Sequence, residues 1–136
     1  KILGLFVGKK NEKIETVLEV IHKKPNLKSL TLIKAVAYNK ARFDMEGKLV
    51  IKRGAKYTDA YLKIDVLLMS ESLEITEDDV KGGHGATVGQ VDKEQLFYLQ
   101  SRGINPEEAE KILVEGFIQE LLDKVEGDEK RKMLTR

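Results

Sequence analysis

The chain has 136 residues, a length typical of one domain that can bury its own hydrophobic core. It contains no cysteine, which excludes disulfides, a thiolate nucleophile and any iron–sulfur site supplied wholly by its own thiolates. Its 24 Lys and Arg against 23 Asp and Glu give a net charge of +1, so charge favours neither nucleic acid nor an anionic membrane as a partner. No apolar run approaches the roughly 20 residues that span a bilayer, and we expect a cytoplasmic protein.

Residues 1–91 show period-two alternation of apolar and polar side chains, which predicts strands rather than helices. The first apolar run starts at residue 2 without a lead-in, from which we expect further sequence upstream of Lys1. Short strands with turns at fairly regular spacing are typical of a sandwich, a barrel or a β-helix, and the pattern alone leaves all three open. The predicted strands are residues 2–7, 14–22, 30–38, 41–45, 49–52, 57–69 and 72–76, with turns at 25–26 and 46–48.

The last third of the chain carries helix signals. Asp92 has the side chain of an N-cap, and Gly103 stands where a left-handed residue ends a short helix. Asn105 followed by Pro106 is a strong start signal for a second helix, which we expect to end at Gly127. The chain therefore divides into a β part, residues 1–91, and a helical part, residues 92–136.

Residues 82–89 read GGHGATVG and hold one histidine among small side chains. His84 is either a metal ligand or acid–base group, or a turn histidine bonded to backbone, and spacing alone favours the turn. The segment lacks the Gly-Lys-Ser/Thr of a phosphate-binding loop, so we reject nucleotide binding and expect glycines at tight corners. The other histidine, His22, follows an apolar run beside two lysines and is expected at the surface.

An acidic run precedes this segment. Glu74, Asp78 and Asp79 could serve general acid–base chemistry or bind a hard cation. Alternation with its apolar neighbours points Glu74 to solvent, and residues 77–79 are most simply a turn. A β-helical enzyme that uses His84 and these carboxylates on a small polar substrate is therefore kept as an alternative function.

Several of these segments together resemble the C-terminal signature of the SufB/SufD family. The similarity lies in residues 73–80, in His84-Gly85-Ala86-Thr87, in the Phe-Tyr-Leu of residues 97–99 and in the Ser-Arg-Gly of residues 101–103. Residues 57–69 are similar to the family's preceding strand. The likeness is strong over residues 54–125 and weak before them.

The resemblance implies a mainly β fold with C-terminal α structure, namely a right-handed β-helix followed by a small helical domain. It implies a scaffold subunit of iron–sulfur cluster assembly that is not an enzyme by itself. Its partners would be a SufC-like ATPase and a SufB/SufD-type subunit or a second copy, with no nucleic acid or membrane. The residues implied for ATPase binding are Phe97, Tyr98, Arg102, Ile112, Gly116 and Phe117. Those implied for the subunit interface are Gly83, His84, Gly85 and Thr87.

The resemblance also implies that His84 handles iron or a transient cluster at that interface. Gly82 stands where many SufD-type chains carry cysteine, so further ligands would come from a partner, and no cofactor would be bound stably by this chain alone. Gly85 stands where SufB-type chains carry Glu, as in SufD-type chains. A homo-oligomeric interaction module without chemistry is the remaining alternative.

Overall fold

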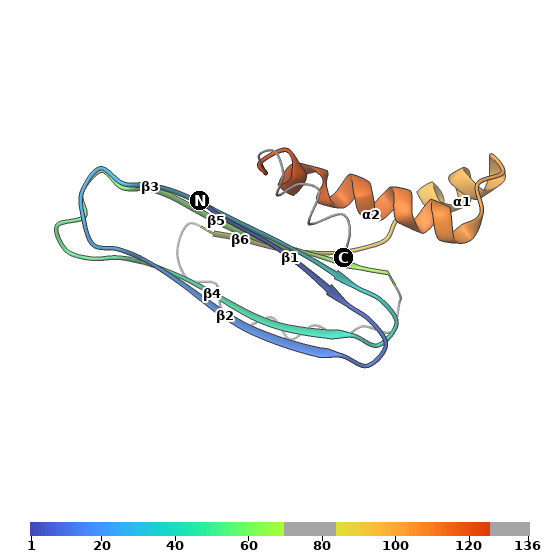
Figure 1. The fold of residues 1–136 in the computed structure, drawn as a ribbon, viewed down its shortest axis with the longest axis horizontal. Coiled ribbons are helices and arrows are strands. Elements are labelled where there is room, and N and C mark those ends of the chain that lie inside the picture. The colour runs from blue at the N-terminus through green and yellow to red at the C-terminus, as the bar shows by residue number, and fades with distance from the viewer. Residues whose placement is uncertain (70–83, 126–136) are drawn as a thin grey trace.

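The computed structural model describes residues 1–69 and 84–125, which form two parallel β-sheets and two helices. In this part of the chain one sheet has the order β1-β3-β5-β6, and the other pairs β2 with β4. From β1 to β5 the chain alternates between the sheets, which Figure 1 shows as two long layers joined by turns at both ends. The strands are β1 (Ile2–Gly8), β2 (Lys13–His22), β3 (Lys28–Ala37), β4 (Arg42–Ile51), β5 (Asp59–Leu68) and β6 (His84–Gln90).

The main hydrophobic core lies between the two sheets. On β5 the alternation seen in the sequence sends Leu62, Ile64 and Val66 into this core, while Lys63 and Asp65 lie on the other face of the sheet. Burial of each such aliphatic side chain stabilises the fold by roughly 1.5–3 kcal/mol. The buried members of the core are Ile33, Ala35, Ala37, Ala41, Phe43, Leu62, Ile64, Val66 and Leu68.

The turn predicted at residues 46–48 is wrong, because β4 runs unbroken from Arg42 to Ile51. Gly47 lies in mid-strand and pairs in register with Leu18. A Cβ at this position would lie 3.0 Å from methyl carbons of Leu62 and Ile64. Glycine is therefore favoured here because the two sheets approach closely, and not because the chain turns.

The corners between the sheets repeat from one turn of the chain to the next. The Lys40 amide donates to the Lys10 carbonyl over 2.8 Å at one end, and the Asn26 amide donates to the Lys56 carbonyl over 2.9 Å at the other. Each corner also holds one non-glycine residue with positive φ, including Asn26 at 57° and Tyr57 at 59°. Successive corners thus stack with matching backbone conformations.

The prediction of a mainly β chain with a helical C-terminal part is confirmed. All strand pairs in the described residues are parallel, unlike the antiparallel neighbours of most sandwiches and up-and-down barrels. The right-handed β-helix stays a prediction. The strand predicted at residues 72–76 lies outside the described residues.

Both helices begin where the sequence predicts. The Asp92 carboxylate accepts from the amides of Glu94 and Gln95 at the start of α1 (Lys93–Ser101), and Gly103 follows its end with φ of 87°. The Asn105 side chain caps α2 (Pro106–Leu122) by accepting from the Glu108 amide. The expected end at Gly127 is wrong, since α2 ends at Leu122 and turns follow. The strand-to-helix change falls between β6 and α1, while the division into two domains stays a prediction.

The second helix packs on the outer face of the four-stranded sheet, as Figure 1 shows. Ile118 and Leu122 of α2 are buried against Val36 of β3, with Leu5 and Phe117 packed around them. By contrast, α1 has no buried residue. Neither helix is long and apolar enough to cross a membrane, a finding that covers residues 1–69 and 84–125.

The prediction that His22 lies at the surface is wrong. His22 is 5% exposed, and its Nε2 lies 2.9 Å from the Ser29 hydroxyl. The alternation along β2 continues through its last residue, so the His22 ring points inward although two lysines follow it.

Candidate functional site

A row of polar side chains crosses the outer face of the four-stranded sheet beneath α2. Lys34 on β3 pairs in register with Asp65 on β5, and Asp65 pairs with Thr87 on β6. Side chains of the same register level on neighbouring parallel strands lie next to one another. The three residues therefore form one line across three strands, a placement that the strand pairing fixes.

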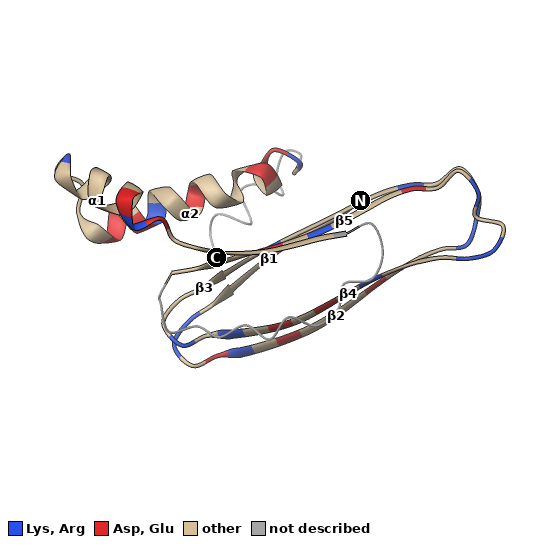
Figure 2. Cartoon of the chain, turned by 180° about the vertical axis from the view of Figure 1, so that it is seen from behind, with Lys and Arg blue, Asp and Glu red and all other residues tan. Residues whose placement is uncertain are grey.

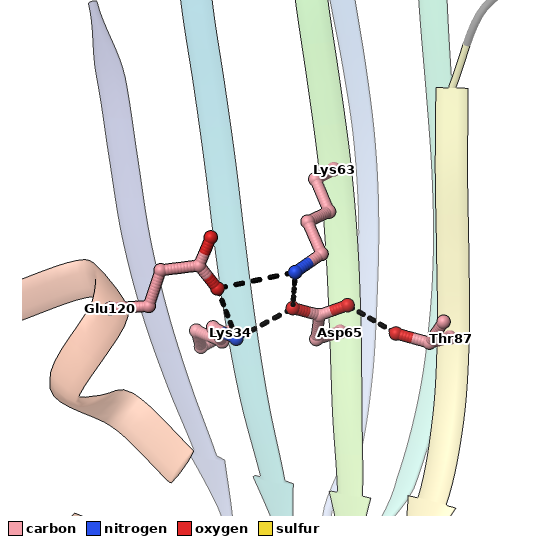
Figure 3. Close-up of polar contacts among 5 residues, drawn as sticks. All are labelled: Lys34, Lys63, Asp65, Thr87 and Glu120. Atoms are coloured by element: carbon pink, nitrogen blue, oxygen red, sulfur yellow. Dashed lines mark hydrogen bonds and ion pairs between the residues drawn. The ribbon is translucent and has the colours of Figure 1, made fainter. Parts of the chain in front are cut away.

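Two further charged groups complete what we call the Asp65 network: Lys34, Lys63, Asp65, Thr87 and Glu120. The Asp65 carboxylate lies 2.6 Å from the Lys34 ammonium and 3.0 Å from that of Lys63, which stands two residues earlier on β5. Glu120 of α2 lies 3.0 Å from Lys34 and 3.2 Å from Lys63. The Thr87 hydroxyl donates to the other oxygen of Asp65. Figure 3 shows this path from α2 to β6.

The centre of the network is buried. The side chains of Lys34 and Asp65 are each 6% exposed, whereas Glu120 is 46% exposed at the rim. The Lys34 ammonium also lies 4.6 Å from the centre of the Phe117 ring, which is within range of a cation–π contact. Two ammonium and two carboxylate groups balance in charge, which offsets the several kcal/mol that each buried ion loses in hydration.

The ion pairs shift the pKa values of both carboxyls downward. Burial raises the pKa of Asp65, but hydrogen bonds from Lys34, Thr87 and Lys63 more than offset burial and hold this pKa below its usual value. Hydrogen bonds from Lys34 and Lys63 lower the pKa of Glu120. The same contacts raise the pKa of Lys63, through its hydrogen bonds to Asp65 and Glu120. All three shifts favour the charged forms.

The sequence predictions did not include this network. One signal for it exists, because Lys34 is a single charge inside the apolar run of residues 30–38. A charge in such a run requires a buried partner. The partner could not be chosen from the sequence, since it depends on the register between β3 and β5.

Three of the four predicted interface residues, His84, Gly85 and Thr87, lie on β6, the last strand of the described sheet. His84 is the first residue of β6 and pairs in register with Leu62, so it is a strand residue rather than a turn residue. Gly85 and Gly89 also lie within β6, and the expectation of glycines at tight corners is wrong for both. Residues 85–90 are exposed, and β6 ends the described sheet. Gly83 lies outside the described residues, as do Glu74, Asp78 and Asp79.

No group of three His, Cys, Asp or Glu side chains that could hold a metal ion occurs in residues 1–69 and 84–125. A role of His84 toward iron stays a prediction. A cluster handled at this strand would be cargo that needs ligands from elsewhere, because thiolates are its usual ligands and the chain has none.

The residues predicted to bind an ATPase separate into two sets. Phe97 and Tyr98 on α1 are 73% and 56% exposed, and Ile112 on α2 is 40% exposed. A groove of about 450 Å³ lies between the helices, lined by Tyr98 and Ile112 among others, and the Arg102 guanidinium lies 5.3 Å from the Tyr98 ring centre. These four residues are exposed on the two helices and on the turn after α1, and we call them together the α1–α2 surface; Phe97 is not among the residues that line the groove.

The other two predicted residues differ from this set. Phe117 is half-buried and packs toward the sheet, where its ring covers Lys34. Gly116 is exposed, and a Cβ there would meet no atom within 4 Å. Within the described chain nothing packs closely on Gly116, so its role in binding stays a prediction.

Comparison with known proteins gives a consistent family. The family model for the SufBD core domain, SUF system FeS cluster assembly, matches residues 1–117. The iron-sulfur cluster assembly protein SufD of Escherichia coli is 35% identical over 145 residues, which cover 100% of this chain and 34% of the relative. SufD of Bacillus subtilis is 34% identical over 139 residues, covering 96% of this chain and 32% of the relative.

A SufBD family protein of Mycobacterium tuberculosis is 34% identical over 127 residues, covering 88% of this chain and 15% of the relative. The chain thus spans between 15% and 34% of the length of these three relatives. The match of the SufBD core along most of the sequence, with SufD relatives aligned along nearly all of it, shows that the chain belongs to the SufB/SufD family of SUF-system iron–sulfur cluster assembly proteins.

Proposed function

We propose that the chain is a scaffold part of a SUF-type iron–sulfur cluster assembly complex and is not an enzyme by itself. In this proposal β6 pairs with a SufB/SufD-type subunit, and the α1–α2 surface docks a SufC-like ATPase. The observation that carries the proposal is the SufBD core match, because it covers both β6 and the α1–α2 surface.

The exposed edge at β6 supports the proposed pairing. A strand that ends a sheet presents unpaired backbone groups, which a strand of another chain can complete. Gly85 and Gly89 leave open space above this strand, since a Cβ at either position would meet no atom within 4 Å. A partner backbone could therefore approach β6 closely, and His84 would then stand at the junction of two subunits.

We also propose that the two sheets are wound as a right-handed β-helix. About 98% of the connections between parallel strands of one sheet are right-handed, because of the right-handed twist of strands. The links from β1 through β2 to β3, and from β3 through β4 to β5, are connections of this kind.

His84 would contribute an imidazole nitrogen to iron or to a cluster, which is the cargo of the complex. The remaining ligands would come from the pairing subunit. Replacement of His84 by Ala should leave the fold intact and slow cluster assembly in the full complex. The control is Gln90→Ala at the other end of β6. Unchanged assembly by the His84→Ala variant would contradict the role.

Docking is tested by capture of a SufC-type ATPase from the same source, with and without ATP. Phe97→Ser should weaken capture, because it removes an exposed aromatic side chain from the α1–α2 surface. The matched control is Val17→Ser on β2, since Phe97 and Val17 are both 73% exposed. Equal capture by the two folded variants would contradict ATPase docking on the α1–α2 surface.

Pairing is tested separately by sedimentation with a SufB-type subunit. Gly85→Lys adds a charged side chain to the edge of β6, where the structure has room for it, and should weaken pairing without unfolding the chain. Val17→Lys places the same charge on the smaller sheet as a control. Pairing that survives Gly85→Lys would contradict the use of β6.

A further inference from the structure

We propose that Asp65 is a positioning residue that couples α2 to the edge strand β6, with Lys34 and Lys63 as the links to the helix. The path has three steps, all visible in Figure 3: Glu120 of α2 contacts both lysines, both lysines contact Asp65, and Thr87 of β6 donates to Asp65.

The two oxygens of Asp65 have different partners, so this carboxylate links the lysines to β6. Oδ2 lies 2.6 Å from the Lys34 ammonium and 3.0 Å from the Lys63 ammonium, while Oδ1 accepts a hydrogen bond from the Thr87 hydroxyl. The carboxylate is planar and rigid, so a shift of the lysines that rotates one oxygen also moves the other. A change at the lysines is thus felt at the hydrogen bond to β6.

Glu120 is the part of the network that can respond to events outside the chain. It is 46% exposed on α2, whereas Lys34 is 6% exposed and cannot turn to water. If the Glu120 carboxylate moves away, two ammonium groups share the single carboxylate of Asp65, and the remaining three charged groups carry a net charge of +1, with Lys34 6% and Lys63 25% exposed. Such a charge is costly in a low-dielectric interior, so the groups rearrange around Asp65.

The strand at the end of this path has β5 as its one neighbour in the described sheet. Thr87 adds a side-chain bond to the backbone ladder, three residues after His84. The network therefore helps to fix the strand that carries His84. The use of this coupling in a complex rests on the proposed function, but the coupling itself is a property of the chain alone.

Hydrogen exchange of backbone amides in the isolated full chain tests the coupling. Glu120→Gln should raise exchange several-fold at residues 85–90, which lie on a different element. The control is Glu115→Gln on the same helix, because Glu115 pairs with Lys111 at the surface, 3.7 Å away. Unchanged exchange in β6 of Glu120→Gln, or an equal rise in Glu115→Gln, would overturn the proposal.

A double-mutant cycle identifies the route. Thr87→Val removes the hydroxyl that Asp65 accepts and should itself raise exchange in β6. Adding Glu120→Gln to Thr87→Val should then raise exchange in β6 little further, because the hydrogen bond between Thr87 and Asp65 is already absent. If the double variant instead shows the product of the two single fold-changes in exchange, the route through Asp65 is overturned. Exchange at residues 13–22 and 42–51 should stay unchanged and confirms that the variants are folded.

This experiment is independent of the proposed function. It needs no ATPase and no second subunit, so a chain that failed to capture the ATPase could still show the coupling. Conversely, the chain could capture the ATPase normally while Glu120→Gln and Thr87→Val change exchange in β6 independently. That result would overturn the coupling but not the proposed docking. Neither the exchange measurement nor the double-mutant cycle uses a substitution of Asp65. The Asp65 side chain is buried, so a change there could prevent the chain from folding.

Discussion

The Lys34 ammonium lies 2.6 Å from Oδ2 of Asp65, and the two residues stand at the same level of neighbouring strands beneath α2. This pair is the buried centre of the contact between sheet and helix. Figure 2 shows further charged residues along the turns, on β2 and β4 and on the helices. The stability of the sheet–helix contact should therefore depend on this pair more than on any surface ion pair of the described chain.

Asp65→Ala should lower the free energy of unfolding by about 3–5 kcal/mol, because it leaves the buried Lys34 without its closest partner. Urea unfolding measures this change. Glu19→Ala is the control, since Glu19 pairs with Lys48 at 3.5 Å on an exposed face and such pairs contribute about 0–1 kcal/mol. Equal losses in the two variants would contradict the importance of the buried pair.

The same carboxyls predict the response to acid. The pKa values of Asp65 and Glu120 are lower in the folded chain than usual, so their charged forms stabilise the fold above an unfolded-state pKa of about 4. This contribution is lost as the pH falls through the lower, folded-state values. Urea unfolding at about pH 6 and about pH 3 should show a smaller acid-induced loss in Asp65→Asn than in the original chain. Equal losses would show that other groups cause it.

The sequence predicted the local structure well. The caps at Asp92 and Asn105 act within a few residues of themselves, and both were confirmed. Period-two alternation located β2, along which exposed and more buried residues alternate. By contrast, β3 was found as an apolar run, because its residues from Thr31 to Ala37 are buried on both faces of the sheet. The same local signals failed at Gly47, where the reason for a glycine is a neighbouring sheet that is distant in the sequence.

The Asp65 network was missed for a related physical reason. Lys34, Asp65 and Glu120 are widely separated along the chain, and their meeting depends on strand register and on the docking of α2. Neither is encoded by local pattern. The same holds for Phe117. Helical spacing places it on the apolar face of the helix, but it does not show that its ring contacts Lys34.

Tyr57 provides a test of the corner conformation. Its φ of 59° is unfavourable for a tyrosine, and its side chain is 86% exposed, so burial of the ring does not offset the strain. The stacked corner uses Asn26 with a φ of 57°. Tyr57→Asn should raise the free energy of unfolding by up to about 1 kcal/mol, because Asn adopts this conformation more readily.

Thermal unfolding of Tyr57→Asn measures that gain. The control is Tyr61→Asn, which places the same substitution on β5, where Tyr61 is 46% exposed and the backbone is extended. Asn is unfavourable in strands, so this control should be less stable than the original chain. A Tyr57→Asn variant no more stable than the original chain would show that the corner does not strain the tyrosine.

Phe117 and Phe97 are expected to differ in what they stabilise. Phe117 packs against the cluster of Val36, Ile118 and Leu122, so Phe117→Ala should lower the free energy of unfolding by about 1–3 kcal/mol. Phe97 is 73% exposed, and Phe97→Ala should change the free energy of unfolding by less than about 0.5 kcal/mol. Urea unfolding of both variants measures the difference. A loss of ATPase capture in Phe117→Ala would then follow from a loosened α2, whereas a loss in Phe97→Ala would report the docking surface itself. Equal stability of the two variants would contradict the placement of Phe117 against the sheet.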